Sequence, residues 1–210
     1  MAPTSTPPRV SESLVELIRQ RRSVRHFTGR PVSRETVAEL LAEAVWSPSP
    51  HNSQPWRFTV LFQKDDKAQL ADAMAERLAT ELRTDGLSVD LIQQQTSRSR
   101  SRITSAPVVI LCCLTGDGLV EFGDERRSSL EFQMAVQSVG AVLQSLFLLA
   151  ELRGLGTCWM AAPMYCPDVV RETLHLPVEL EPQALVLMGY PAGPGKVRPR
   201  RPASEMFDLR

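Results

Sequence analysis

The run FQMAVQSVGAVLQSLFLLAEL, residues 132–152, is the longest apolar stretch of the chain and sets its architecture. Its apolar side chains cover most of a helix rather than one stripe, which is typical of a helix buried on most sides. Five Gln and Ser side chains interrupt the run, and such groups are costly in lipid. We therefore expect the central helix of a soluble fold, with part of its cover supplied by a second subunit.

Helical and strand patterns alternate on both sides of this run. A serine followed three residues later by glutamate predicts capping boxes at Ser13 and Ser128, which would open the first helix and the central helix. Four apolar segments interleaved with helices predict an α/β or α+β sandwich with a mostly buried sheet. The expected strands are 57–63, 106–114, 156–161 and 183–190, in a single domain spanning 11–210 after a loose tail, 1–10.

The composition excludes several classes of protein. Lys+Arg and Asp+Glu both number 24, so the chain lacks the basic excess of a nucleic-acid binder. The four cysteines form no C-x-x-C pair, the three histidines lack a metal-ligand spacing, and no secretory signal is present. We expect buried thiols, no metal, no nucleic-acid or membrane partner, and a cytoplasmic location.

Two basic clusters stand near opposite ends of this neutral chain. Arg21, Arg22, Ser23 and Arg25 offer guanidinium and hydroxyl donors that suit phosphate oxygens. In the tail, prolines alternate with cations and stiffen the segment that carries them. The simpler interpretations are a solvated helix end for the first cluster and a loose basic terminus for the tail. The sequence leaves open whether the two clusters meet. The cations of the tail are Lys196, Arg198, Arg200 and Arg201.

The loop SPSPHNSQPW, residues 47–56, is longer than most helix-to-strand connections. Its Ser49, Asn52 and Gln54 could hydrogen-bond the polar edge of a ring, although a plain connection is the alternative. The segment GLGTCWMAAP, residues 154–163, is interpreted mainly as a helix C-cap, with a ligand-binding loop as the second interpretation. It does not match the glycine pattern of a dinucleotide-binding motif. No catalytic side chain stands out, so a bound cofactor would have to carry any chemistry.

These stretches, in this order, resemble the FMN-dependent nitroreductase family. The matching segments are RRSVRHF (21–27), SPSPHNSQPWRF (47–58), LAELRGLGTCWM (149–160) and LVLMGYPAGPGKVRPRRP (185–202). The resemblance implies an α+β three-layer sandwich with a central, mostly antiparallel sheet flanked by helices. It also implies an intertwined homodimer with FMN at the interface.

The resemblance assigns roles to particular residues. Arg21, Arg22, Ser23 and Arg25 would hold the FMN phosphate and ribityl chain, joined by Arg198 and Arg200. Pro48, Ser49 and Asn52 would come from the other subunit, with Gln54 supporting their loop. Backbone at Met160, Ala161 and Ala162 would face the reactive flavin nitrogen, where the family often has an acidic residue and a glycine.

The implied activity is ping-pong hydride transfer from NAD(P)H through FMN to a small aromatic, quinone or nitro acceptor. A narrower resemblance is to the flavin-binding C-terminal domain of the deazaflavin-coenzyme γ-glutamyl ligase. The segments that carry it are ELRTDGLSVDLIQQQ (81–95), SPHNSQPWRF (49–58) and LRGLGTCWM (152–160). It implies a stand-alone reductase of a dehydro precursor of that coenzyme. Arg98, Arg100 and Arg102 would then meet the phosphate-linked side chain of the precursor, although a solvated helix face is the simpler reading. A third alternative is a flavin-binding or flavin-modifying protein without reductase activity.

Overall fold

A computed structural model describes residues 10–210, with side chains from residue 14 onward. The predicted tail, 1–10, lies outside these residues except for its last position. Each predicted helix and strand is present within a few residues of its expected bounds. The helices are α1 (Val10–Gln20), α2 (Arg34–Ala44), α3 (Lys64–Thr84), α4 (Val89–Ser105), α5 (Glu125–Leu152) and α6 (Pro167–Thr173). The strands are β1 (Trp56–Leu61), β2 (Val108–Leu114), β3 (Gly156–Met160) and β4 (Glu181–Gly189).

The four strands form one antiparallel sheet in the order β1-β2-β4-β3. All seven residues of β2 are buried, which confirms the prediction of a strand covered on both faces. Side chains alternate along this strand: Ile110 packs into one core cluster, and Leu111 packs into the other. A two-sided core of this kind requires helices on both faces of the sheet.

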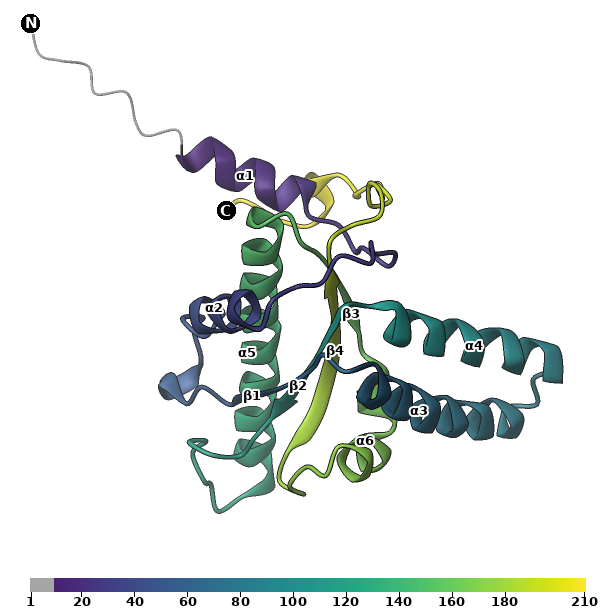
Figure 1. Ribbon diagram of the computed structural model, residues 1–210. Helices are drawn as coiled ribbons and strands as arrows, with labels where there is room; N and C mark the ends of the chain where they lie inside the picture. Colours follow the sequence, from purple (N-terminus) through teal and green to yellow (C-terminus); the bar gives the residue numbers. More distant parts are fainter. Residues whose placement is uncertain (1–9) are drawn as a thin grey trace, which may run out of the picture.

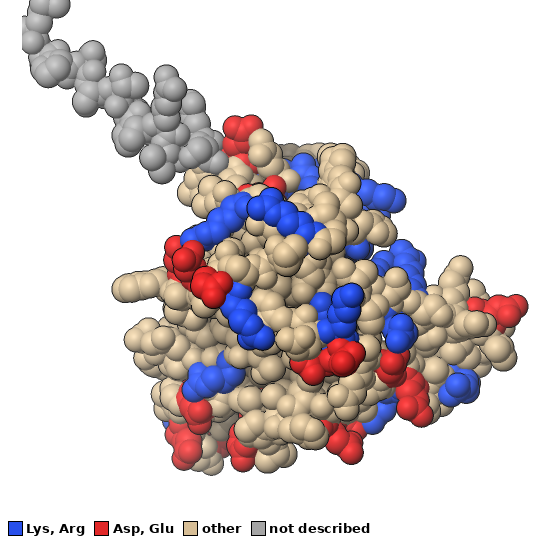
Figure 2. Space-filling view, in the orientation of Figure 1, with Lys and Arg blue, Asp and Glu red and all other residues tan. Residues whose placement is uncertain are grey.

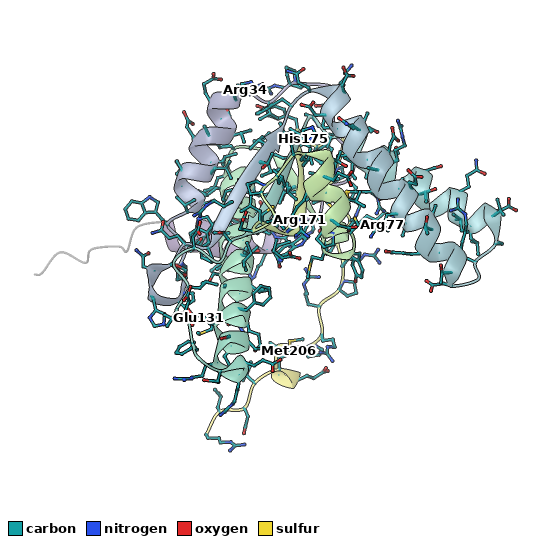
Figure 3. The ribbon with its side chains drawn as sticks, turned by 90° about the horizontal axis from the view of Figure 1, so that it is seen from below. Arg34, Arg77, Glu131, Arg171, His175 and Met206 are labelled. Carbon is teal, nitrogen blue, oxygen red and sulfur yellow. The ribbon has the colours of Figure 1, made fainter. Side chains whose placement is uncertain are left out.

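Helices cover the two faces in separate groups (Figure 1). The core cluster on one face contains side chains from α2 and α5, and the cluster on the other face contains side chains from α3, α4 and α6. Figure 3 views the molecule from below, with Arg77 of α3 and Arg171 of α6 on that second side. The architecture is the predicted α+β three-layer sandwich.

The long helix begins earlier than the sequence suggested. Asp124 is the N-cap, and its side chain accepts a hydrogen bond from the backbone N–H of Arg127 at 3.0 Å. The predicted cap at Ser128 is therefore wrong. Its predicted partner Glu131 is instead buried and accepts a bond from the backbone N–H of Val120, in the loop before the helix. The predicted cap at Ser13 is also wrong, because α1 begins at Val10.

Helix α5 ends as predicted at Arg153 and at Gly154, whose φ is 69°. Among the described residues it is the one helix long and apolar enough to cross a membrane, and 44% of its most apolar window is buried within the chain. Leu130, Phe132 and Met134 stay exposed on α5. One chain therefore leaves part of the apolar surface of this helix uncovered.

Helices α3 and α4 form a hairpin that projects from the sheet (Figure 1). The turn between them uses Gly86, with φ 77°, and the N-cap Ser88. At the base, the buried Lys67 Nζ donates to the carbonyl oxygens of Ala106 at 2.7 Å and Pro107 at 3.0 Å. The hairpin is thus anchored at its base, which fixes the direction in which α4 presents its side chains.

Candidate functional site

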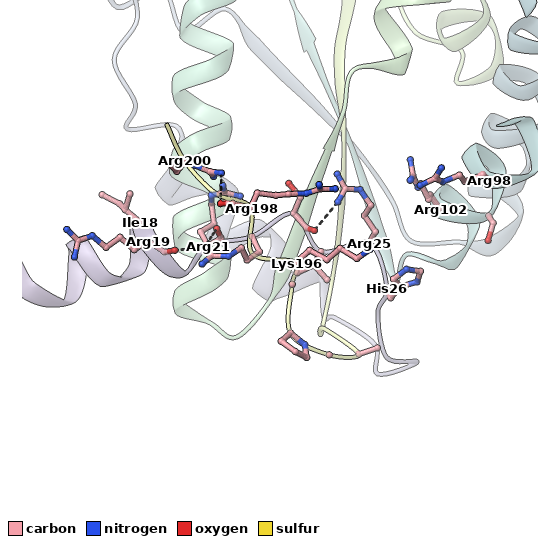
Figure 4. A pocket seen from close by; sticks show the side chains of 18 residues that line it. Ile18, Arg19, Arg21, Arg25, His26, Arg98, Arg102, Lys196, Arg198 and Arg200 are labelled. Atoms are coloured by element: carbon pink, nitrogen blue, oxygen red, sulfur yellow. Dashed lines mark hydrogen bonds between the residues drawn. The ribbon is translucent and has the colours of Figure 1, made fainter. Parts of the chain in front are cut away.

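A pocket of about 1040 Å³ lies where the two ends of the chain approach each other (Figure 4). Three segments line it: the end of α1 with the residues that follow, one side of α4, and the arm after β4, which we define as residues 192–200 and call the C-terminal arm. The lining residues are Ile18, Arg19, Arg21, Arg22, Ser23, Val24, Arg25, His26, Arg98, Ser101, Arg102, Ala192, Gly193, Pro194, Gly195, Lys196, Arg198 and Arg200.

The segment after α1 is attached to the sheet by backbone pairing. Ser23 forms a parallel bridge with Thr157 of β3, and the Val24 N–H donates to the Thr157 carbonyl at 2.8 Å. Further along, Ala192 N–H donates to the carbonyl of His26 at 3.0 Å. These contacts hold the first basic cluster between the edge strand and the C-terminal arm.

The C-terminal arm passes very close to Arg22. A Cβ placed on Gly195 would lie 2.4 Å from Arg22 Cβ, so only glycine allows this approach. The two basic clusters predicted from the sequence therefore lie in one pocket. This convergence was the question that the sequence left open.

Positive charge dominates the lining of the pocket. Nine of the eighteen lining residues are Arg or Lys, and none is Asp or Glu. Within residues 14–210, none of the nine takes part in a salt bridge, whereas seven other arginines do. In Figure 2 the blue side chains toward the upper right have few red neighbours, and the lower edge mixes both colours. The chain has gathered cations here without supplying their counter-charge.

Nearby groups respond to this concentration of charge. Burial lowers the pKa of Arg102, and the positive charges of Arg98 and Arg25 lower it further. Burial raises the pKa of the Cys158 thiol on β3, while Arg25 and Arg102 act in the opposite direction. A bound anion would relieve the repulsion among these cations.

Helix α4 contributes to the pocket through one side only. Arg98 and Arg102, four residues apart, both line it together with Ser101. Arg100 faces α3 instead and pairs with Asp72 through two nitrogens, one of them 3.2 Å from the carboxylate. Of the three arginines singled out on this helix, two therefore share the pocket with the first basic cluster and one does not.

The loop 47–56 lies outside the pocket of one chain. Three of its non-glycine residues lie in the left-handed region: His51 (φ 52°) and Asn52 (φ 55°) of the 3-10 turn Pro50–Asn52, and Gln54 (φ 47°) beyond it. Ser49 Oγ accepts a bond from the Gln54 N–H at 3.0 Å and helps to hold this shape. Strained backbone of this kind clusters at functional sites. Pro48, Asn52 and Gln54 are exposed, and Ser49 is half-buried.

Met160, Ala161 and Ala162 are also absent from the lining of the pocket. They stand where β3 ends and the 3-10 turn Ala162–Tyr165 begins, with Ala161 exposed. Pairing of Met160 with Leu185 places them at the opposite end of β3 from Thr157, which contacts the first basic cluster. Their predicted role stays a prediction, as do the roles of the loop 47–56.

The donor set of the pocket fits a phosphate group. Guanidinium groups offer paired N–H donors that match phosphate oxygens, and Ser23 adds a hydroxyl. Among the described residues no cluster of three His, Cys, Asp or Glu side chains is placed to hold a metal ion. The fold and the pocket together define an α+β protein with a cationic pocket whose donors suit an anionic, phosphate-bearing ligand.

Comparison with known proteins names the family. Residues 18–190 match the sequence model of the nitroreductase family, and the chain belongs to that family. It is 30% identical to the 5,6-dimethylbenzimidazole synthase of Rhodospirillum rubrum over 187 residues, covering 88% of this chain and 84% of that protein. It is 25% identical to the putative NAD(P)H nitroreductase YfhC of Bacillus subtilis, with 92% of each chain covered.

A solved structure supports the same assignment. A putative nitroreductase from Desulfovibrio desulfuricans, crystallised in complex with FMN, superposes with a TM-score of 0.72. It is 27% identical and covers 99% of this chain and 98% of its own. The family predicted from the ordered motifs is confirmed.

Sequence reasoning missed several residues of the pocket. The sequence pattern gives Arg19 no role beyond a helix, and it does not mark Gly195, because a close approach to Arg22 leaves no local signal. The P-A-G-P-G run, residues 191–195, was the available hint, since such a run allows backbone to pass close to other groups.

Proposed function

We propose that the protein is a cytoplasmic, FMN-dependent NAD(P)H oxidoreductase that acts by a ping-pong cycle on a small aromatic, quinone or nitro acceptor. The observation that carries the proposal is the pocket of nine cations without an acid, in a chain of the nitroreductase family. When bound, FMN supplies the two-electron chemistry, taking hydride from NAD(P)H and passing it to the acceptor.

In this proposal the chain's own residues bind and orient the cofactor. Arg21, Arg22, Ser23 and Arg25 hold the phosphate and ribityl chain from one side of the pocket, and the C-terminal arm approaches from the other. The phosphate of the cofactor would supply the counter-charge that these guanidiniums lack among the described residues. The residues of the arm in this role are Arg198 and Arg200.

A homodimer completes the proposed site. Exposed apolar side chains on α5, including Phe132 and Met134, are the surface that a second copy would cover. Pro48, Ser49 and Asn52 would then reach the flavin from the partner, held by the strained loop that includes Gln54. Backbone at 160–162 would face the ring. The second subunit would account for the absence of Pro48, Ser49 and Asn52 from the single-chain pocket.

Two alternative functions have specific support. The 5,6-dimethylbenzimidazole synthase relative favours a flavin-modifying protein without NAD(P)H reductase activity. The presence of Arg98 and Arg102 in the pocket favours a reductase of a phosphate-bearing acceptor, such as the deazaflavin-coenzyme precursor.

Anaerobic titration of the purified yellow protein separates these functions. We expect NADPH or NADH to bleach the flavin and a quinone or nitroaromatic to restore it. Failure to bleach contradicts the reductase proposal and favours the flavin-modifying alternative. If the deazaflavin precursor reoxidises the flavin much faster than quinones do, the favoured function is a reductase of that precursor.

The double variant Arg22→Ala with Arg200→Ala tests the phosphate assignment. Each charge-assisted hydrogen bond contributes roughly 1.5–3 kcal/mol. The pair should therefore weaken FMN binding by about 10²- to 10⁴-fold, so that flavin separates from the protein on gel filtration. Arg83→Ala with Arg126→Ala is the matched control, since both side chains are exposed and lie outside the pocket. Equal flavin retention in the two double variants would refute the assignment.

A further inference from the structure

We propose that Arg98, Ser101 and Arg102 of α4 form a second anion subsite that binds a phosphate group of the electron donor or the acceptor, apart from the FMN phosphate. The inference rests on the proposed function, because it assigns a substrate class to the same pocket. It follows from the number of cations, their distribution along the pocket and the geometry of α4.

The number of cations exceeds what one cofactor phosphate requires. A phosphate monoester carries a charge of about −1.5 to −2 at neutral pH. The five arginines assigned to FMN already outnumber this charge. Four further cations line the pocket with no acidic side chain among them: Arg19, Arg98, Arg102 and Lys196. A second anion would balance the excess.

The cations are spread along the pocket rather than gathered at one point. In Figure 4, Arg21, Arg198 and Arg200 stand at one end, and Arg98 and Arg102 stand at the other. Lys196 and Arg25 lie between these groups. A single phosphate group bonds only the donors that surround it, so one phosphate cannot satisfy both ends. The α4 end is thus available to a second ligand.

The geometry of α4 supports an anion subsite on the side of the helix that faces the pocket, where Arg98 and Ser101 are exposed. Arg98 and Arg102 are like charges at a spacing of four residues, which destabilises a helix unless an anion lies near them. Arg102 is half-buried, and the hydroxyl of Ser101 adds a donor on the same side of the helix. By contrast, Arg100 has its own counter-charge in Asp72. Only the arginines that face the pocket lack one.

The ligand class that fits is a substrate with a phosphate or pyrophosphate group. NADPH and NADH carry such groups on the donor side, and a phosphorylated acceptor would carry one on the other. A neutral quinone or nitroaromatic gains nothing from these guanidiniums. The subsite therefore predicts discrimination between substrates that differ only in their phosphate.

The test compares two variants of the flavin-loaded protein. One is the double variant Arg98→Gln/Arg102→Gln, and the other is the control Arg100→Gln. We expect the double variant to retain its flavin. Its KM should rise about 10-fold or more for NADPH if the donor uses the subsite, or for FMN as an added acceptor if the acceptor does. The phosphate-free counterparts, 1-benzyl-1,4-dihydronicotinamide and riboflavin, should change less than about two-fold. Arg100→Gln, which removes one arginine charge from the same helix outside the pocket, should behave as the wild type.

Calorimetric titration with inorganic pyrophosphate reads the subsite without turnover. The wild type and Arg100→Gln should bind the probe, and the double variant should bind it at least about 10-fold more weakly. This measurement decides the inference even if NAD(P)H fails to bleach the flavin, a result that counts against the proposed function alone. Pyrophosphate binding that is equal in the wild type and the double variant would overturn the subsite. Loss of FMN from the double variant would also overturn it, by assigning these arginines to the cofactor phosphate.

Discussion

Substitution of Gly195 by alanine tests how the C-terminal arm is held. The new Cβ would lie 2.4 Å from Arg22 Cβ and 2.9 Å from Arg22 Cγ. Carbon atoms are in ordinary contact at about 3.5–4.0 Å, so the arm and Arg22 must separate by roughly 1.1–1.6 Å. The Arg22 atoms lie next to the backbone, and rotation of the flexible end of the side chain cannot relieve the clash.

The magnitude follows from the contacts that this shift removes. Overpacking at a close contact costs about 1–3 kcal/mol if the structure resists it. If the arm moves instead, Arg198 or Arg200 leaves the phosphate, and one charge-assisted bond of roughly 1.5–3 kcal/mol is lost. Because the arm is mostly exposed, we expect it to move, and FMN affinity should then fall by about 10- to 150-fold. Thermal stability of the flavin-free protein should change little, because the arm is mostly exposed.

Gly193→Ala is the matched control, since nothing lies within 4 Å of a Cβ at that position of the same arm. Neither glycine has a positive φ, so alanine introduces no backbone strain at either site. FMN affinity is measured by quenching of flavin fluorescence, and stability by thermal unfolding without flavin. Equal FMN affinity in the two variants would refute the reasoning that the arm's approach to Arg22 positions its arginines.

Two further predictions concern assembly and acid stability. Phe132→Asp should raise the dissociation constant of the dimer on the order of 100-fold or more, because a charge would be buried unpaired in the proposed interface. Sedimentation of this variant should show single chains. The control Val178→Asp, at a position 75% exposed, should stay dimeric. If Phe132→Asp sediments as a dimer, that face of α5 is not the interface. Two hydrogen bonds from Arg127 lower the pKa of the Asp124 carboxyl below its ordinary value of 3.8. The larger effect comes from the backbone N–H and the smaller from the guanidinium. The unfolded chain therefore binds more protons, and stability is lost as the pH falls from about 4 through the lower folded pKa. Asp124→Asn keeps the cap and should lose less stability over that window in urea unfolding; an equal loss would contradict this account.

Much of the fold was predictable from local patterns. The apolar run 108–114 had to be buried on both faces, and the proline before Asp168 marked the start of α6. The starts of α1 and α5 were not predicted correctly. Asp124 and Ser128 both offer a capping side chain, and the choice depends on Glu131, which bonds the preceding loop rather than its own helix end. Such a tertiary contact leaves no mark in the local sequence.

The candidate site divides in the same way. Guanidinium and serine donors near Arg22 and in the tail were visible as phosphate-binding chemistry, and the family resemblance located them. Their meeting depends on the pairing of Ser23 with Thr157 and on the lack of a side chain at Gly195. Likewise, only the rotation of α4 decides that Arg102 faces the pocket while Arg100 pairs with Asp72. These are properties of the assembled chain.

The position of the cationic pocket has a consequence for biosynthesis. Its walls come from residues 21–25 and 196–200, so the last residues needed follow the final strand of the sheet. A ribosome makes the chain from its N-terminus, so the nascent polypeptide lacks the cations of the C-terminal arm until residue 200 has been added. In the proposed function, flavin capture would therefore follow synthesis of the C-terminal arm, and a chain truncated before residue 196 would lack three of the nine cations of the pocket.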